Sequence, residues 1–341
     1  MLINSSDYLA VINDIKSRIR LTQRRVLLSA NAELFMLYWN IGKVINEYSV
    51  WGNKFIENLA YDIKLDFPDT RGYSVRNLKY MAKFYKTFPD FEIVQSLTAQ
   101  LTWTHSNVLL DKVKGQDEFL WYAQRNSESG WSVDLLKEQI ENKLYERQVL
   151  TKKTNNFQER LTPPQSDLAL QTMKDPYMFD FIQYREGMVE REIEAELVKN
   201  ITKLLLELGT GFAFVGNQYH IEVENEDFYL DLLFYHLKLR CYVVIELKTG
   251  DFKPEYAGKL NFYISAVDDL LKAERDNPTI GLLLCKNKRG MIAEYSLRDI
   301  EKPIGVSEYK LFKNLPKEYE NILPSAEDIE KRIGLLPGVD D

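Results

Sequence analysis

The feature that most constrains the fold is a change of pattern about halfway along the chain. Before about residue 150, apolar residues recur three and four positions apart, as in Leu27, Leu34, Leu37, Ile41 and Val44, which is the spacing of amphipathic helices. After about residue 180, short runs rich in β-branched and aromatic residues alternate with helical stretches. The two patterns predict two structurally different parts in one chain.

Composition supplies the predicted boundaries. Residues 1–150 are predicted to form an all-helical domain of about six helices, broken only at Gly or Pro positions. Residues 151–180 turn polar and contain Thr162-Pro163-Pro164, which predicts a linker region. Residues 181–325 are predicted to form the second domain, followed by an acidic tail over residues 326–341. The expected class is therefore α+β with two domains.

The second domain is expected to be an α/β sandwich, because its elements follow the order helix, antiparallel meander, helix, strand. One long helix is predicted over residues 189–208 and another over 256–271, with a short helix over 291–297. The predicted strands are 212–215, 219–223, 228–236, 241–247, 280–285 and 305–311.

Charge and cysteine content exclude several classes of protein. The net charge of -7 over 341 residues argues against a protein that coats nucleic acid indiscriminately. Residues 1–150 carry 19 Lys+Arg and 18 Asp+Glu, whereas residues 181–341 carry 21 and 29, so any nucleic-acid surface must be local. The two cysteines predict neither a disulfide framework nor a structural zinc site. With neither a secretory leader nor a membrane-length apolar run, a cytoplasmic location is expected.

The candidate catalytic residues lie in two predicted strands. Asp231 lies in the first strand, and Glu246 and Lys248 lie in the second. If residues 237–240 form the hairpin loop, His236 opposes Cys241, and counting outward places Asp231 opposite Glu246. Since side chains alternate along a strand, Glu246 and Lys248 share one face. Two carboxylates and an ammonium group are thus predicted to converge.

This convergence predicts a metal-dependent site. Two adjacent carboxylates among apolar residues repel each other unless a cation joins them, and Mg²⁺ (or Mn²⁺) prefers oxygen ligands and substrate phosphate. Asp231 and Glu246 are the predicted metal ligands, with the carbonyl of Leu247 as a third, and Lys248 is predicted to orient water or stabilise the transition state. The alternative interpretation of Glu246-Leu247-Lys248 is a cross-sheet ion pair.

The pattern resembles the PD-(D/E)XK nuclease superfamily, with Asp231 matching its Asp and Glu246-Leu247-Lys248 matching (D/E)XK, although Leu230 replaces the usual Pro. Across nearly the whole chain the sequence is similar to the YhcG-type bacterial family, which pairs a helical N-terminal domain with a restriction-endonuclease-like domain. The segments that carry this resemblance are 204–209, 211–216, 228–236, 253–263 and 302–305. The resemblance implies a nuclease-type fold and nucleic-acid processing.

The resemblance also suggests further site residues. Related folds often place a metal-facing carboxylate on the preceding helix, for which Glu194 is the first choice and Glu207 the second, the alternative for each being a solvated or capping residue. Lys259 falls where many relatives carry a Gln, and a basic residue there could meet a phosphate, the alternative being a surface lysine. Gln218, in the strand before Asp231, is a further candidate for nucleic-acid contact.

The helical half offers a basic stripe. Ser74 is a natural N-cap, and Arg76, Lys79, Lys83 and Lys86 then fall on one face of a helix, opposite an apolar face. With another helix predicted just before it, the stripe suggests helix-turn-helix docking on nucleic acid. The alternative is a solvated lysine face.

Three functions are weighed against one another. The first is a Mg²⁺-dependent nuclease that hydrolyses phosphodiester bonds, with DNA favoured over RNA, in restriction, defence or DNA processing; a homodimer would supply two active sites for a duplex. The second is a catalytically silent nuclease-fold scaffold whose helical domain binds protein partners in a defence complex. A DNA-binding regulator ranks last, because it leaves the second domain's charged residues unexplained.

Overall fold

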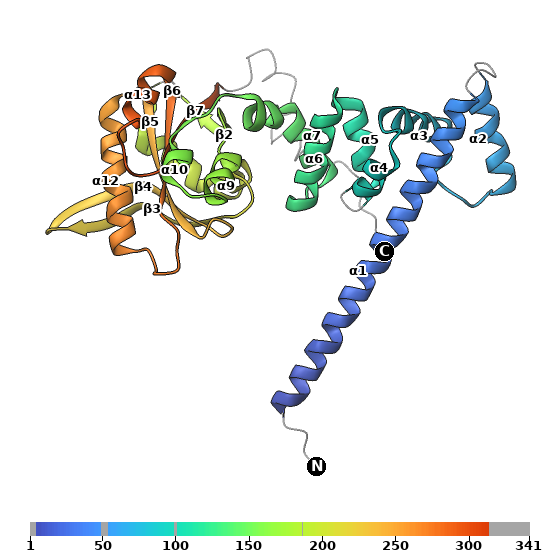
Figure 1. Cartoon of the computed structure of the whole chain (residues 1–341), viewed down its shortest axis with the longest axis horizontal. Coiled ribbons are helices and arrows are strands. Elements are labelled where there is room, and N and C mark those ends of the chain that lie inside the picture. Colours follow the sequence, from blue (N-terminus) through green and yellow to red (C-terminus); the bar gives the residue numbers. More distant parts are fainter. Residues whose placement is uncertain (1–4, 49–53, 99–100, 186, 314–341) are drawn as a thin grey trace, which may run out of the picture. The chain divides into compact units, whose positions relative to one another are not determined.

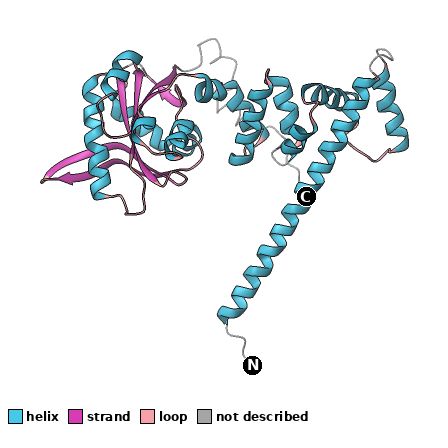
Figure 2. Cartoon of the chain, viewed as in Figure 1, coloured by secondary structure: helices cyan, strands magenta, loops and turns pink. Residues whose placement is uncertain are grey.

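The computed structural model describes residues 5–48, 54–98, 101–185 and 187–313. The chain divides into two compact units, Met1–Tyr145 and Glu146–Asp341. Figures 1 and 2 show helices alone in the first unit and a sheet flanked by helices in the second. The predicted class, a helical N-terminal part followed by an α/β sandwich, is confirmed.

The first unit contains seven described helices, one more than the approximate prediction. They are α1 (Ser5–Glu47), α2 (Phe55–Asp66), α3 (Val75–Thr87), α4 (Phe91–Thr98), α5 (Trp103–Lys112), α6 (Gln116–Ser129) and α7 (Val133–Glu141). The helix α6 ends at Gly130, which adopts a φ of 62°, and Pro68 and Pro89 follow the ends of α2 and α3 within two residues. Their core is aromatic, with Phe35, Phe84 and Phe88 fully buried.

The second unit is built on a seven-stranded mixed sheet with the order β1-β7-β6-β5-β4-β3, and β2 pairs with β7. The strands are β1 (Thr154–Asn155), β2 (Tyr177–Tyr184), β3 (Phe212–Val223), β4 (Glu226–His236), β5 (Cys241–Asp251), β6 (Ile280–Asn287) and β7 (Ile304–Lys313). The β3, β4 and β5 strands form an antiparallel meander, whereas β5, β6 and β7 run parallel. The remaining elements are η2 (Glu146–Leu150), α8 (Phe157–Arg160), α9 (Gln165–Thr172), α10 (Glu190–Lys199), α11 (Ile201–Leu208), α12 (Pro254–Leu270) and α13 (Gly290–Leu297).

The sheet buries a separate core on each face. On one face, α10 and α11 contribute Ile193, Leu197 and Leu204 to a cluster that includes Leu247. On the other face, α12 contributes Leu260 and Ile264 to a second cluster. Because side chains alternate along β5, Leu247 faces α10 and α11, while its neighbours Glu246 and Lys248 face the α12 side.

The predicted linker over residues 151–180 is wrong, because this segment is folded into the second unit. β1 pairs with β7, and the buried side chain of Asn156 donates to the carbonyl oxygens of Ile300 and Lys302 and accepts from the amide of Ile304. These partners lie more than 140 residues away in sequence, so local composition could not reveal them. The predicted acidic tail over residues 326–341 lies outside the described residues.

Two element predictions needed correction. The helix predicted over residues 189–208 is broken at Asn200 into α10 and α11, where the Asn200 side chain donates to the carbonyl of Glu196. The two strands predicted over 212–215 and 219–223 form one strand, β3, with a register shift between Phe214 and Gly216.

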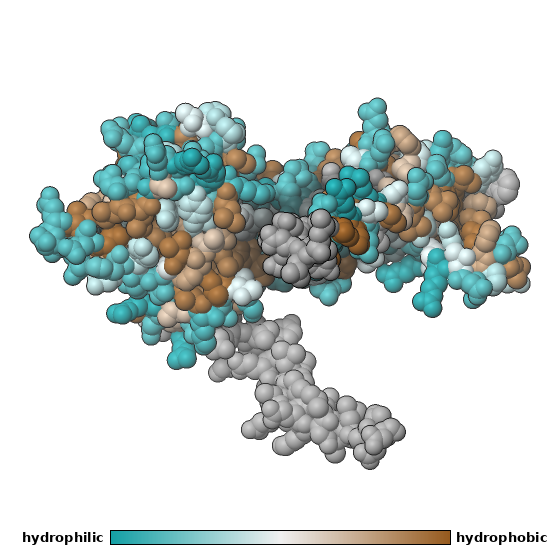
Figure 3. Space-filling model, turned by 90° about the horizontal axis from the view of Figure 1, so that it is seen from below, coloured by the Kyte–Doolittle hydropathy of each residue, from teal (hydrophilic) through white to brown (hydrophobic). Residues whose placement is uncertain are grey.

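The surface of the molecule mixes polar and apolar residues. Figure 3 shows hydrophilic residues interspersed with apolar areas on the viewed face. Among the described helices, none combines the length and apolar character needed to cross a bilayer.

Candidate active site

The β4–β5 hairpin brings Asp231 and Glu246 to neighbouring positions. The predicted register is confirmed by the pairs His236↔Cys241 and Leu232↔Ile245, and one further step outward on each strand reaches Asp231 and Glu246. The Asp231 carboxylate accepts a hydrogen bond of 2.8 Å from the backbone amide of Leu247. Because directly opposed residues of antiparallel strands point to the same face, the two carboxylates share one side of the sheet.

Glu246 is completely buried and lies between two lysines. Its Oε1 atom is 3.0 Å from Nζ of Lys248 and 2.6 Å from Nζ of Lys259, which reaches over from α12. Its Oε2 atom is buried and has no hydrogen-bond partner among the described residues. A buried carboxylate oxygen without a partner costs free energy, so this atom marks a position where a cation would be stabilising.

Lys248 is held as an ammonium group. Its Nζ lies 2.9 Å from Glu190 Oε2, donates to the Leu247 carbonyl at 2.8 Å, and sits 5.4 Å from the centre of the Tyr256 ring. Burial alone lowers the pKa of Lys248, but Glu246 and Glu190 more than offset it, so that the pKa is raised above its usual value. Lys248 therefore supplies positive charge and is not a base at neutral pH.

The surroundings of Asp231 disfavour its charged form, whereas those of Lys248 favour its charged form. Burial first, and then the neighbouring charge of Glu246, raise the pKa of Asp231 to about 7, although the Leu247 amide, Lys248 and Lys259 partly lower it. The negative charge on Asp231 is thus disfavoured beside Glu246 at neutral pH. A bound cation between the two carboxylates would relieve this repulsion.

The structure does not bring Glu194 to these carboxylates as a third acidic ligand. Glu194 is buried, but its carboxylate accepts hydrogen bonds from the side-chain amides of Asn217 at 3.0 Å and of Gln218. Among the described residues, no three His, Cys, Asp or Glu side chains are grouped so as to hold a metal ion. Glu207, the second choice, is paired instead with Arg147 at 2.5 Å. The oxygen donors that remain together are Asp231, Glu246 and the Leu247 carbonyl.

Gln218 and Lys259, both predicted to contact nucleic acid, have protein partners. Gln218 adopts a φ of 42°, at a position that the β3–β4 register places opposite Asp231, and its amide faces Glu194. Lys259 contacts Glu246, and this bond offsets the effect of burial and raises the pKa of Lys259. Both residues therefore lie around the candidate site, and their contact with nucleic acid stays a prediction.

Glu190 is a site residue that sequence reasoning missed. It is the first residue of α10, and its two carboxylate oxygens reach Lys248 and, at 3.3 Å, the amide of Thr249. The available signal was its position one helical turn before Glu194 on the same helix face. The sequence gives no sign that the first residue of α10, rather than a residue in the middle of the helix, lies next to Lys248 at the end of β5.

The basic stripe of the helical unit follows α3 as predicted. Ser74 caps α3 by accepting from the amide of Asn77 at 3.3 Å, and Leu78, Met81 and Phe84 form the buried face. The exposed face carries four basic residues, Arg76, Lys79, Lys83 and Lys86.

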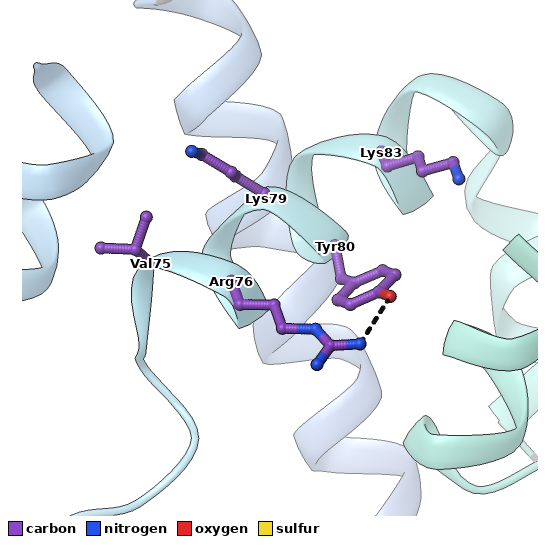
Figure 4. A pocket seen from close by; sticks show the side chains of 5 residues that line it. All are labelled: Val75, Arg76, Lys79, Tyr80 and Lys83. Carbon is purple, nitrogen blue, oxygen red and sulfur yellow. Dashed lines mark hydrogen bonds between the residues drawn. The ribbon is translucent and has the colours of Figure 1, made fainter. Parts of the chain in front are cut away.

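This face borders an open pocket of about 460 Å³ lined by Val75, Arg76, Lys79, Tyr80 and Lys83. Figure 4 shows Arg76 lying along Tyr80, with Lys79 and Lys83 extending from the same helix. Lys79 lies 3.4 Å from Glu57 and Lys83 lies 3.3 Å from Asp111, in ion pairs whose side chains are about half exposed. Exposed pairs of this kind contribute roughly 0–1 kcal/mol, so they hold both lysines only weakly.

Comparison with known proteins identifies both units. The family model described as the YhcG PDDEXK nuclease domain matches residues 170–324, and the model described as the DUF1016 N-terminal domain matches residues 14–147. The chain is 30% identical over 326 residues to a protein of Escherichia coli (strain K12) that is named "Putative nuclease YhcG". That match covers 85% of this chain and 86% of the Escherichia coli protein.

Two solved structures are similar to part of the chain, each at 16% sequence identity. One is a complex of EndoMS with double-stranded DNA, with a TM-score of 0.27 over 40% of this chain and 49% of that chain. The other is a repair endonuclease from Pyrococcus abyssi, with a TM-score of 0.25 over 38% of this chain and 50% of that chain. This chain thus spans about half the length of each solved chain.

Proposed function

Because the chain belongs to the YhcG family, whose members carry a PDDEXK nuclease domain, we propose that it is a metal-dependent nuclease that hydrolyses phosphodiester bonds, in DNA in preference to RNA. The observation that carries the proposal is the buried, unpartnered Oε2 atom of Glu246 beside Asp231 and Lys248. Two carboxylates and a permanent cation in one apolar region are costly as structure alone. They are the groups required for metal-assisted phosphoryl transfer.

The residues present fit a hard divalent cation such as Mg²⁺ or Mn²⁺. Asp231, Glu246 Oε2 and the carbonyl oxygen of Leu247 would hold it, all of them oxygen donors of the kind that these ions prefer. When bound, the ion would lower the pKa of a coordinated water and offset charge on the scissile phosphate.

The chain's own residues would orient these groups. The Leu247 amide fixes the Asp231 carboxylate, and Glu190 holds the ammonium group of Lys248 next to Glu246. Because Lys248 stays protonated, its role would be to stabilise the negative charge that develops on the phosphate, and not to remove a proton from water.

The α2–α3 pair supports DNA as the substrate class. A short helix precedes, across the eight residues 67–74, a second helix whose exposed face is basic and whose buried face packs into the core, and a helix of this kind can lie in the major groove of DNA. Its charge would hold the phosphate backbone without reading sequence, since lysine and arginine contacts to phosphate supply position and affinity. The helical unit would then bind the substrate that the second unit cuts.

Replacing Lys79 and Lys83 together by alanine is expected to weaken nucleic-acid binding most at low salt. Each lost phosphate contact should reduce the slope of log K against log salt by about 0.9, so the double variant should lose roughly 1.8. Fluorescence anisotropy of a labelled duplex from low to moderate salt would measure this slope. Lys137→Ala is the matched control, because Lys137 is an exposed lysine of the same unit paired with Asp134. An unchanged slope in the double variant would exclude α3 as the phosphate-binding surface.

The function is tested by incubating the full chain with supercoiled, linear, branched and single-stranded DNA and RNA, with Mg²⁺, with Mn²⁺ or with EDTA. We expect cleavage only with metal and faster on DNA than on RNA. If the protein neither bound metal nor cut any substrate, the nuclease proposal would be refuted.

A scaffold without catalytic activity is the second candidate, and one observation favours it. Lys248 and Lys259 both contact Glu246, so the chain's own cations compensate this carboxylate without any metal. In that case calorimetric titration would detect no Mg²⁺ or Mn²⁺ binding, and the helical unit would serve to bind protein partners. Metal binding with a one-to-one stoichiometry would exclude this candidate.

A further inference from the structure

The N-terminal part of α1 carries a surface that the proposed nuclease function does not use. Near its C-terminal end α1 is part of the core, with Phe35, Tyr38 and Ile45 buried. Residues 13–23, by contrast, are all exposed, and Figure 1 shows this part of α1 extending away from the other helices of its unit. The stretch 5–30 alone is about 39 Å long at 1.5 Å per residue. Helices in proteins gain most of their stability from packing an apolar face against another element.

Five positions of this stretch follow a seven-residue repeat, and four of them are apolar. Ile12, Ile15, Ile19, Thr22 and Val26 are spaced by three, four, three and four positions, which makes Ile12, Ile19 and Val26 the a positions and Ile15 and Thr22 the d positions of a heptad. Large fractions of these side chains are exposed: 48% of Ile15, 52% of Ile19 and 61% of Val26. A repeat of seven, unlike the 3.6-residue period of a helix packed on a globular core, keeps one narrow seam facing a second helix.

The residue types and charges identify the partner helix. β-Branched residues at the a positions favour two strands when isoleucine does not also fill the d positions, and here isoleucine fills only one of the two d positions, Ile15, the other being the polar Thr22. The flanking g positions are Arg18 and Arg25, and the e positions are Lys16 and Gln23. In a parallel pair of identical helices, Arg18 faces Gln23 of the other copy and Arg25 faces Ala30, so no like charges meet. An antiparallel pair would bring g positions face to face and oppose arginines, which is unfavourable.

We propose that the chain forms a homodimer through a parallel, in-register coiled coil of the exposed part of α1, with a second copy of this chain as the partner. The described seam contains fewer than three full heptads, with a polar Thr22 at one d position, so the dimer is reversible and depends on protein concentration. The inference rests on α1 alone and stands whether or not the second unit cuts nucleic acid.

The oligomeric state of the full chain tests the proposal. Analytical ultracentrifugation over a wide concentration range should give a wild-type mass approaching twice that of one chain. The double variant Ile15→Gln/Ile19→Gln should have the mass of one chain throughout, because glutamine keeps the helix but removes the apolar seam. Leu21→Gln is the matched control, since Leu21 is an equally exposed apolar residue, 56% exposed, at a c position outside the seam, and it should stay dimeric. A monomeric wild type, or a double variant that remains dimeric, would overturn the proposal.

Cysteine crosslinking tests the orientation independently. Thr22→Cys places a thiol on the seam, and in a parallel in-register dimer it meets the same residue of the other copy, so mild oxidation should yield a disulfide-linked dimer on a denaturing gel. The native Cys241 and Cys285 are buried and provide a low background. Absence of crosslinking in a protein that sediments as a dimer would refute the parallel arrangement. A monomeric wild type whose nucleic-acid affinity falls in the Ile15→Gln/Ile19→Gln variant would instead assign this basic helix to nucleic acid.

Discussion

Replacing Glu246 by glutamine is expected to abolish the binding of Mg²⁺ and Mn²⁺ and to lower the rate of metal-dependent cleavage by about 10³-fold. Glutamine has nearly the same shape but carries no charge, and it puts an amide where one of the carboxylate oxygens lay. The site would lose the negative charge that Asp231 and a divalent cation share. Since metal binding and cleavage depend on the same carboxylate, both should disappear together.

The variant should remain folded, which makes the loss interpretable. Lys259 is 45% exposed and can turn its ammonium group toward water, while Lys248 keeps Glu190 as a partner. Circular dichroism and thermal unfolding would verify this. Glu255→Gln is the matched control, because Glu255 lies in the first turn of the same α12 helix and its exposed side chain is 4.0 Å from Lys253. This control should bind metal and cut as the wild type does.

The two possible failures of this prediction have different meanings. If Glu246→Gln cut nucleic acid at the wild-type rate, the active centre would lie elsewhere in the chain. If neither protein bound metal or cut, the compensation of Glu246 by Lys248 and Lys259 would be the permanent state of the site, as in a scaffold. Calorimetric titration alongside the cleavage assay separates these outcomes.

The sequence predicted the β4–β5 hairpin because every constraint there is local. A four-residue loop and strict alternation set the register, and a slip of one residue would turn the apolar side chains away from the cores. Asp231, Glu246 and Lys248 therefore occupy the expected positions. The α3 helix was equally predictable, because its cap, its buried face and its basic face all lie within one short segment.

The supporting residues could not be predicted because long-range packing places them. Glu194 was expected at the metal, but the backbone of β3 turns at Gln218 so that the amides of residues 217 and 218 meet the Glu194 carboxylate. Glu190 reaches Lys248 only because α10 begins beside the end of β5. Neither contact leaves a periodic signal in the sequence.

Replacing Glu207 by alanine is expected to lower the free energy of unfolding of the second unit by roughly 3–5 kcal/mol, because the change would leave buried cations without their carboxylate. Glu207 lies 2.5 Å from Arg147 and 3.6 Å from Lys174, and all three side chains are less than one tenth exposed. It also accepts from the backbone amide of Met178 at 2.9 Å, which joins α11 to the start of β2. The carboxylate that was a candidate metal ligand thus connects η2, β2 and α11.

The chain provides its own internal control for this experiment. Its five tryptophans, Trp39, Trp51, Trp103, Trp121 and Trp131, all lie in the first unit, so their fluorescence during urea unfolding reports that unit, whereas far-ultraviolet circular dichroism reports both. In Glu207→Ala, the circular dichroism transition of the second unit should move to lower urea while the fluorescence transition stays in place. Glu196→Ala removes a carboxylate from the neighbouring helix α10, where it pairs with an exposed lysine, and should cost no more than about 1 kcal/mol. If Glu207→Ala were no more destabilising than Glu196→Ala, the buried ion cluster would contribute little to the second unit, and apolar burial with the pairing of β2 to β7 would hold η2 and β2 in place.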